Sequence, residues 1–153
     1  MKFKLAPIQC GWWLKKRTCL ADTKLIKLGM IKKIETNNAP KAPEIYSQAI
    51  VAGNMVFLSG QLGIDPSTGK LPESFEDQAQ NVMNNLKAIL QEADSSFEQV
   101  VKVTIFLDNM ANYAKMNEIY LSFFPDHKPA RSCIQVAALP LGGKVEIELI
   151  AVK

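Results

Sequence analysis

The chain has 153 residues, of which 48% are hydrophobic and 22% charged, a composition typical of one ordinary globular domain. No apolar stretch approaches the roughly 20 residues that span a bilayer, which excludes a membrane helix. Residues 1–29 hold seven basic and one acidic residue (net +6), and residues 30–153 hold eleven basic and fourteen acidic residues (net −3), which disfavours a nucleic-acid surface on the larger part.

Residues 1–29 differ from the rest of the chain. They combine lysines with Trp12 and Trp13 without regular periodicity, and they end just before Met30. They lack the long apolar core and cleavage site of a secretory signal, and with one Arg and no Ser they are atypical of a transit peptide. We expect an N-terminal extension over residues 1–29, with Met30 as a natural start, and a single domain over residues 30–153.

Three strands are predicted before the first helix, at residues 31–35, 50–52 and 55–59. Gly53-Asn54, between the second and third strands, is a typical hairpin turn. The third strand leads into a loop, in which the segment Asp65-Pro66-Ser67-Thr68-Gly69 is a strong turn signal.

Two helices are predicted. Ser74 begins the first, because Asp77 three residues later completes a capping box. The apolar positions of this helix keep helical spacing throughout: Ala79, Val82, Met83, Leu86, Ile89, Leu90 and Ala93. The second helix is expected from about Met110 to Phe124, where Pro125 ends it.

Three further strands are predicted at residues 100–107, 130–137 and 144–152, giving the order β-β-β-α-β-α-β-β. Two helices can cover only one face of such a sheet. Residues 100–107 and 144–152 nevertheless carry apolar side chains in both alternating sets, with Val100 and Phe106 beside Val101, Val103 and Ile105 in the first of them. We therefore expect the second face of this α+β fold to pack against another subunit.

Arg131 is the one arginine among the eleven basic residues of the range 30–153, and it follows a proline at a strand entrance. Its planar guanidinium can bind a carboxylate through two parallel hydrogen bonds, which lysine cannot do. Most arginines are solvated, so this position alone is weak support for a site.

Other polar residues are individually ambiguous. Glu146 and Glu148 alternate on the last strand, and they either lie in water at an edge or line a cavity. Cys133 shares a strand face with Arg131 and is more often a small buried side chain than a nucleophile. With His127 as the single histidine and Cys133 as the only cysteine after residue 29, we expect no metal site and a reducing compartment.

Six segments occur in an order that resembles the reactive-intermediate deaminase family (RidA, also called YjgF-type). The resemblance covers about residues 30–153. The segments are Ala39-Pro40-Lys41-Ala42-Pro43, Tyr46-Ser47-Gln48-Ala49, Phe57-Leu58-Ser59-Gly60-Gln61, Asn117-Glu118-Ile119-Tyr120 with Phe123-Phe124, Pro129-Ala130-Arg131-Ser132-Cys133 and Val145-Glu146-Ile147-Glu148.

The resemblance implies a chorismate-mutase-like α+β fold, a mixed sheet with two helices on one face, in a homotrimer with clefts between subunits. It implies hydrolysis of 2-imino acids such as 2-iminopropanoate and 2-iminobutanoate to 2-keto acids and ammonia, in the cytoplasm and without a cofactor. Arg131 would bind the substrate carboxylate and Glu146 would activate water. The residues implied to shape or line the cleft are Tyr46, Ser59, Gly60, Asn117 and Cys133.

The chain departs from the family pattern at two residues, because Glu44-Ile45 stands where Gly-Pro usually precedes the tyrosine.

Two alternatives to a deaminase stay open. A non-catalytic sensor of small carboxylates would use the same arginine. A ribonuclease or translation inhibitor fits less well, because the body is acidic and the chain lacks a histidine pair.

Overall fold

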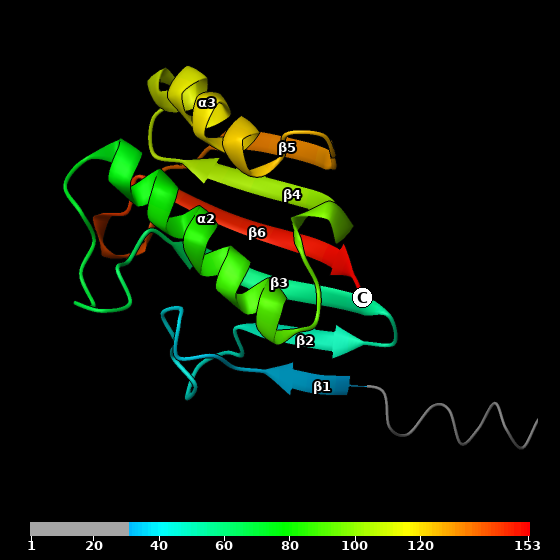
Figure 1. The fold of residues 1–153 in the computed structure, drawn as a ribbon. Helices are drawn as coiled ribbons and strands as arrows, with labels where there is room; N and C mark the ends of the chain where they lie inside the picture. The colour runs from blue at the N-terminus through cyan, green and yellow to red at the C-terminus, as the bar shows by residue number, and fades with distance from the viewer. Residues whose placement is uncertain (1–30) are drawn as a thin grey trace, which may run out of the picture. The chain divides into compact units, whose positions relative to one another are not determined.

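A computed structural model describes residues 31–153 of the chain, so the predictions for residues 1–29 and for Met30 lie outside the described residues. The strands and helices follow the predicted order (Figure 1). The strands are β1 Ile31–Ile34, β2 Ala49–Ala52, β3 Met55–Leu62, β4 Val100–Leu107, β5 Ala130–Gln135 and β6 Val145–Val152. The helices are α2 Phe75–Glu92 and α3 Tyr113–Phe123, with short 3₁₀ turns η2 Phe97–Gln99, η3 Met110–Asn112 and η4 Pro140–Gly142.

The strands form one mixed six-stranded sheet in the order β1-β2-β3-β6-β4-β5. All neighbours are antiparallel except β4 and β5, which are parallel and connected through α3. The last strand of the chain, β6, therefore lies in the middle of the sheet (Figure 1).

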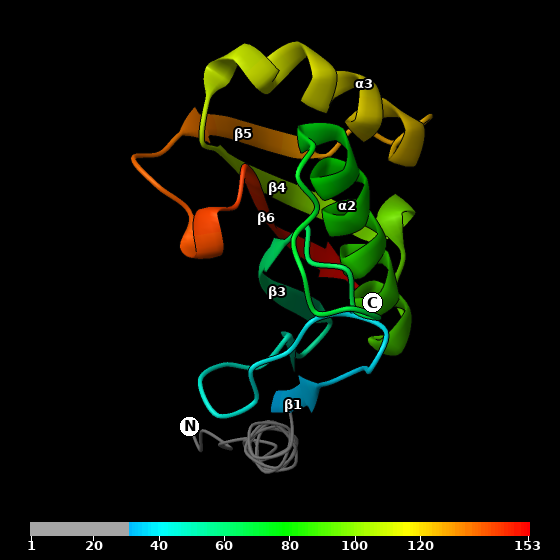
Figure 2. The same ribbon diagram turned by 90° about the vertical axis from the view of Figure 1, so that its left-hand side faces the viewer.

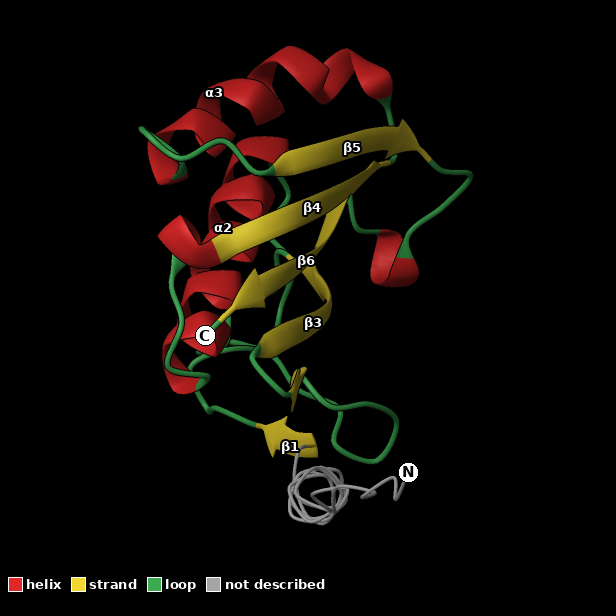
Figure 3. Cartoon of the chain, turned by 90° about the vertical axis from the view of Figure 1, so that its right-hand side faces the viewer, coloured by secondary structure: helices red, strands yellow, loops and turns green. Residues whose placement is uncertain are grey.

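Helices α2 and α3 cover one face of the sheet, which Figures 2 and 3 show from two sides. The predicted capping box at the start of α2 is confirmed: Ser74 Oγ accepts a hydrogen bond from Asp77 N at 3.0 Å and donates one to Asp77 Oδ2 at 2.7 Å. All seven apolar positions predicted to face the core are buried. Such burial stabilises the fold by roughly 1.5–3 kcal/mol for each large side chain.

Some predicted boundaries are wrong by a few residues. The second α-helix begins at Tyr113 and not at Met110, because residues 110–112 form a 3₁₀ turn capped by Asn109 Oδ1. Strand β3 continues past Ser59 to Leu62 through a register shift between Leu58 and Gln61. Strand β5 ends at Gln135, whose side-chain Oε1 accepts a hydrogen bond from Met110 N at 3.0 Å.

The face opposite the helices carries apolar side chains as the strand patterns predicted, with Val101 exposed in place of Val100. Val100 is buried together with Val103, because a register shift between Val100 and Lys102 turns it toward the core. The open face carries Phe57, 43% exposed, and the half-buried Phe106 and Ile150. It also carries Lys102, Thr104, Glu146 and Glu148.

Neither α2 nor α3, the α-helices of residues 31–153, has the length and apolar character needed to cross a membrane.

Candidate active site

The sheet separates the expected site residues into two groups. Arg131 and Cys133 are in register with Val103 and Ile105 of β4, which are buried under the helices, so both side chains lie on the helical side. Glu146 is in register with Phe106 and Leu62 and lies on the open face. Within one chain, Arg131 and Glu146 are therefore on opposite faces of the sheet.

The first group, which we call the Arg131 site, lies between α3 and β5 and consists of Tyr113, Asn117, Tyr120 and Arg131. Arg131 Nη2 donates hydrogen bonds to Asn117 Oδ1 at 2.7 Å and to the Tyr113 hydroxyl at 3.2 Å. The guanidinium carbon lies 4.8 Å from the centre of the Tyr120 ring and 5.6 Å from that of Tyr113, within the range of cation–π attraction. These contacts fix the plane of the guanidinium.

The fixed guanidinium still has donors available. Within residues 31–153, both of its side-chain hydrogen bonds use Nη2, which leaves Nη1 and Nε for a ligand. Arg131, Asn117 and Tyr120 border a cavity of about 330 Å³. An edge of this kind can bind a carboxylate through two parallel bonds.

Tyr120 borders the same cavity, but its hydroxyl oxygen is buried. Its side chain is only 5% exposed, and its hydroxyl has no hydrogen-bond partner in the described part of the chain. Burial raises the pKa of Tyr120 to about 12, against the opposing effect of the Arg131 charge. The hydroxyl is therefore neutral at physiological pH.

The second group, which we call the Glu146 site, consists of Tyr46, Ser59, Gly60 and Glu146. All four border a cavity of about 730 Å³ on the side of β3 and β6. The carboxylate of Glu146 lies so close to Gly60 that a Cβ atom there would collide with Glu146 Oε1. Glycine is therefore required if the carboxylate is to keep this position.

The environment of Glu146 disfavours its charged form. Burial raises the pKa of the Glu146 carboxyl, and the neighbouring charge of Glu148 on the same strand raises it further. A carboxyl with a raised pKa is a better proton acceptor and donor near neutral pH than a solvated one.

Ser59 connects the sheet to the loop that carries Tyr46. Its hydroxyl donates a hydrogen bond to Ser47 O at 2.7 Å, and its backbone N–H donates to Gln48 O at 3.0 Å. The hydroxyl proton is therefore used within the chain, and only the oxygen lone pairs are left for a ligand.

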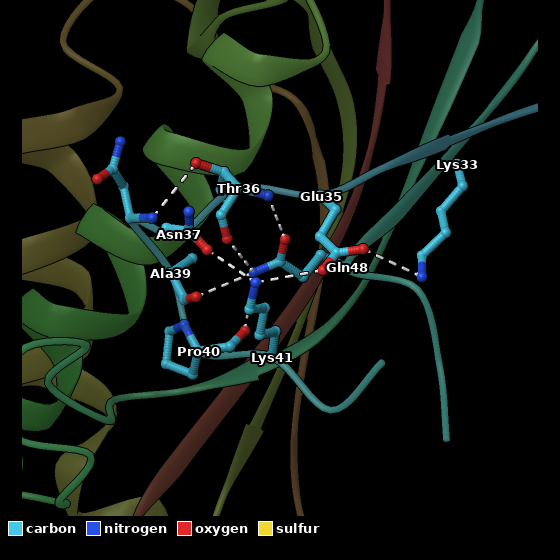
Figure 4. A network of polar contacts seen from close by, with 9 residues as sticks. Lys33, Glu35, Thr36, Asn37, Ala39, Pro40, Lys41 and Gln48 are labelled. Atoms are coloured by element: carbon cyan, nitrogen blue, oxygen red, sulfur yellow. Dashed lines mark hydrogen bonds and ion pairs between the residues drawn. The ribbon is translucent and has the colours of Figure 1, made fainter. Parts of the chain in front are cut away.

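A buried glutamine, Gln48, holds the loop before Tyr46 in place (Figure 4). Its Oε1 accepts a hydrogen bond from Thr36 N at 2.7 Å, and its Nε2 donates to Thr36 O, Ala39 O and Pro40 O at 3.0 to 3.1 Å. Because Pro40 and Lys41 border the larger cavity, this network fixes one of its walls.

Cys133 packs against the hydrophobic core and is partly buried. Burial raises the pKa of its thiol, although the charge of Arg131 opposes the shift. A thiol in this state is a poor nucleophile, because the thiolate is the reactive form.

Several residues of these two sites were not singled out as site candidates in the sequence. Tyr113 and Tyr120 hold Arg131, and Gln48 holds the loop of the Glu146 site. Tyr120 lies three residues after Asn117 on a helix, so helical spacing could have suggested that both reach one ligand. Gln48 has no such signal, since its partners are backbone groups of a loop.

A scan against protein families matches residues 36–153 to the family described as Endoribonuclease L-PSP. The chloroplastic Reactive Intermediate Deaminase A of Arabidopsis thaliana is 49% identical over 129 residues, which cover 82% of this chain and 69% of the relative.

Solved structures show the same similarity. RidA from an Antarctic Psychrobacter species is 45% identical, with a TM-score of 0.77 over 80% of this chain and 99% of the other. Escherichia coli TdcF with bound serine is 43% identical, with a TM-score of 0.77 over 80% of this chain and 98% of the other.

Proposed function

Because this chain belongs to the Endoribonuclease L-PSP family, also called the YjgF/RidA family, we propose that it hydrolyses reactive 2-imino acids to 2-keto acids and ammonia. The proposed substrates are 2-iminopropanoate and 2-iminobutanoate, together with their enamine tautomers. The name of the Arabidopsis relative supports a deaminase-type activity. We assign this function to residues 30–153 and regard residues 1–29 as an extension.

The observation that carries the proposal is a pair of complementary groups: a guanidinium with free donors and a partly buried carboxyl with a raised pKa. An imino acid needs both, because its carboxylate requires an anchor and its C2 carbon requires an activated water. Serine, which is bound to Escherichia coli TdcF, also has a carboxylate, and its amino group is on C2, where the imino acid has its imine nitrogen.

Since Arg131 and Glu146 lie on opposite faces of one sheet, we propose that each complete site forms between two subunits. In a head-to-tail contact, the Arg131 site of one subunit would meet the Glu146 site of the next. Such contacts close into a ring when the rotation allows it, and a homotrimer is the ring we propose. The exposed side chain of Phe57 on the open face gives this contact an apolar component.

In the proposed reaction, Arg131 binds the substrate carboxylate and thereby fixes C2 near the water held by Glu146. The water oxygen attacks C2 while Glu146 accepts one of its protons and passes that proton to the imine nitrogen, which gives a carbinolamine with a hydroxyl and an amino group on C2. Glu146 then accepts the proton of the carbinolamine hydroxyl and gives it to the amino nitrogen, so that the C–N bond breaks as the C=O bond forms and ammonia leaves the keto acid. The rate gain comes from proximity and from general acid–base catalysis.

The proposal requires no covalent nucleophile and no cofactor. Cys133, with its raised thiol pKa, lines the Arg131 side of the cleft and does not attack the substrate. The same proposal places the protein in the cytoplasm, where a free thiol such as that of Cys133 stays reduced.

A ribonuclease activity, which the family description names, has less support in this chain. General acid–base cleavage of RNA commonly uses paired titratable groups near neutral pH, and His127 is the one histidine. Its Nε2 contacts the Val100 carbonyl at 2.5 Å, so this nitrogen is used within the fold. A non-catalytic sensor would need the Arg131 site alone, and the raised pKa of Glu146 favours the enzyme.

The test is subunit complementation. Arg131→Lys and Glu146→Gln, each nearly inactive alone, are refolded together and assayed for keto-acid release from a threonine dehydratase reaction, with an imine scavenger as control. Random mixing leaves one wild-type Arg131 opposite one wild-type Glu146 in about one quarter of the clefts. Recovery of about that fraction of the wild-type rate of keto-acid release supports a site shared between subunits. An absence of activity in well-formed mixed oligomers contradicts it.

A further inference from the structure

Two strongly exposed apolar side chains border the cavity of the Glu146 site. Ile45 is 84% exposed and Leu141 is 78% exposed, and the two residues lie far apart in the chain. Both nevertheless line the cavity that contains Glu146 and Gly60. Exposed apolar residues that converge on one cavity indicate a binding surface rather than scattered surface residues.

Leu141 is also held in an unfavourable backbone conformation. Its φ of 57° lies in the left-handed region, which a branched residue seldom adopts, and it is followed by Gly142 with φ 70°. Strained positions of this kind cluster at ligand sites, where the surrounding structure holds a side chain in a required place. Here the strained residue is Leu141, one of the two exposed apolar residues that line the cavity.

The lining of the cavity is mixed in polarity. Ser59 and the Glu146 carboxyl give its lining polar groups, and Ile45, Leu141 and Pro140 give it apolar ones. The volume, about 730 Å³, lies in the upper half of the range for small-molecule sites. A short-chain imino acid with its reacting carbon at Glu146 would fill little of this volume and would leave apolar lining groups in water.

We infer that Ile45 and Leu141 bind the side chain of the substrate, and that the preferred substrates are 2-imino acids with large apolar side chains, branched aliphatic or aromatic. This inference rests on the proposed function, because the reacting carbon must lie at Glu146. Enzymes that oxidise hydrophobic amino acids to their imines would supply such substrates. Transfer of the substrate side chain out of water, onto Ile45 and Leu141, provides the selectivity.

The test compares imines made in place by an amino-acid oxidase from alanine, leucine and phenylalanine. The variants are Ile45→Ser and Leu141→Ser, and the matched control is Ile31→Ser, because Ile31 is 78% exposed on β1 and does not line the cavity. We expect wild type to prefer the two larger imines. Each cavity variant should lose about tenfold in kcat/KM on them and less than about twofold on the alanine imine, with the control unchanged.

Leu141→Gly separates the side chain from the strain, because glycine adopts positive φ freely. If it matches Leu141→Ser, the side chain sets the preference; if it keeps wild-type selectivity, the inference is wrong for Leu141. Equal losses on all three imines, or a wild type that prefers the alanine imine, would also overturn it.

Light scattering tests the competing role of Ile45 and Leu141, which is contact with a neighbouring subunit. Dissociation of the Ile45→Ser and Leu141→Ser oligomers would show that these side chains contact a neighbouring subunit, which overturns the inference. A wild type that hydrolyses none of the imines refutes the proposed function itself, and this result is distinct from an altered preference among substrates that are all hydrolysed.

Discussion

The Arg131 site and the Glu146 site are positioned in different ways. Side chains of one helix hold the guanidinium: Asn117 by a hydrogen bond and two tyrosine rings by their faces. The carboxyl of Glu146 instead depends on the absence of a side chain at Gly60, since a Cβ atom there would collide with its oxygen. The anchor therefore depends on added contacts and can be weakened gradually, whereas the proposed base depends on free space and can be displaced by one methyl group.

The largest effect is expected for Glu146→Gln. The change keeps the shape and removes the proton acceptor, so kcat should fall by about 10²- to 10⁴-fold while keto-acid binding measured by calorimetry is kept. Folding raises the pKa of the Glu146 carboxyl, so this group stabilises the folded state fully when the pH is below its pKa in the unfolded chain. That stabilisation is lost as the pH rises through its pKa in the folded chain. The melting temperature at neutral pH should therefore not fall. Normal turnover would remove Glu146 from the mechanism.

Arg131→Lys should have the next largest effect. Lysine keeps the charge but loses the planar pair of donors and the stacking on Tyr120. We expect a loss of about 2–4 kcal/mol in transition-state binding, from kcat/KM, together with weaker keto-acid binding. Full activity in this variant would contradict the role of the guanidinium as a two-bond anchor.

Gly60→Ala tests the role of free space in the Glu146 site. The added methyl group would push the carboxylate aside, so we expect about 10- to 100-fold lower kcat with little change in melting temperature. Gly63→Ala is the matched comparison, because a Cβ there would meet the backbone of Gln78, which cannot move away as a side chain can. Gly63→Ala should therefore lower the melting temperature, and equal stability of the two variants would contradict this distinction.

Tyr113→Phe tests the contacts that hold Arg131. It removes the hydrogen bond of 3.2 Å and keeps the ring, which should cost about 1 kcal/mol and appear as a several-fold higher KM with kcat nearly unchanged. Tyr113→Leu, which also removes the ring, should have a larger effect on KM. If both variants bind substrate as wild type does, Asn117 and Tyr120 suffice to hold the guanidinium.

The smallest effect is a shift of the pH profile in Glu148→Gln. The charge of Glu148 helps to raise the pKa of Glu146, so its removal should lower that pKa. A general base must be ionised, and the acidic limb of the kcat profile should therefore move to lower pH, with the maximal rate nearly unchanged. Glu118→Gln, at an exposed position of α3, serves as the control and should leave the profile where it is.

Local sequence patterns predicted most of the elements of the fold. The Ser74–Asp77 capping box and the spacing of apolar residues placed α2 correctly, because both signals act within one or two turns. Gly53, with φ 67°, makes the predicted turn between β2 and β3. The boundary errors at Met110 and Ser59 come from a 3₁₀ turn and a register shift, which depend on neighbouring strands and not on local pattern.

The site could be predicted less completely from the sequence than the fold. The alternation of Arg131 and Cys133 correctly predicted that they share a face, since a strand fixes that relation by itself. The pattern could not predict that Glu146 lies on the opposite face. That relation depends on how β4 and β6 pair in the sheet, which only long-range contacts determine.

The central position of β6 bears on how the protein is made. Among the strands of the sheet, β6 is synthesised last, and it must insert between β3 and β4, which are synthesised long before it. Until then, β3 and β4 each have an unpaired edge and the apolar side of α2 has an incomplete sheet to pack against, a state prone to aggregation. A chain truncated before Val145 would lack the strand that joins the two halves of the sheet, so the fold and Glu146 are completed in the same late step.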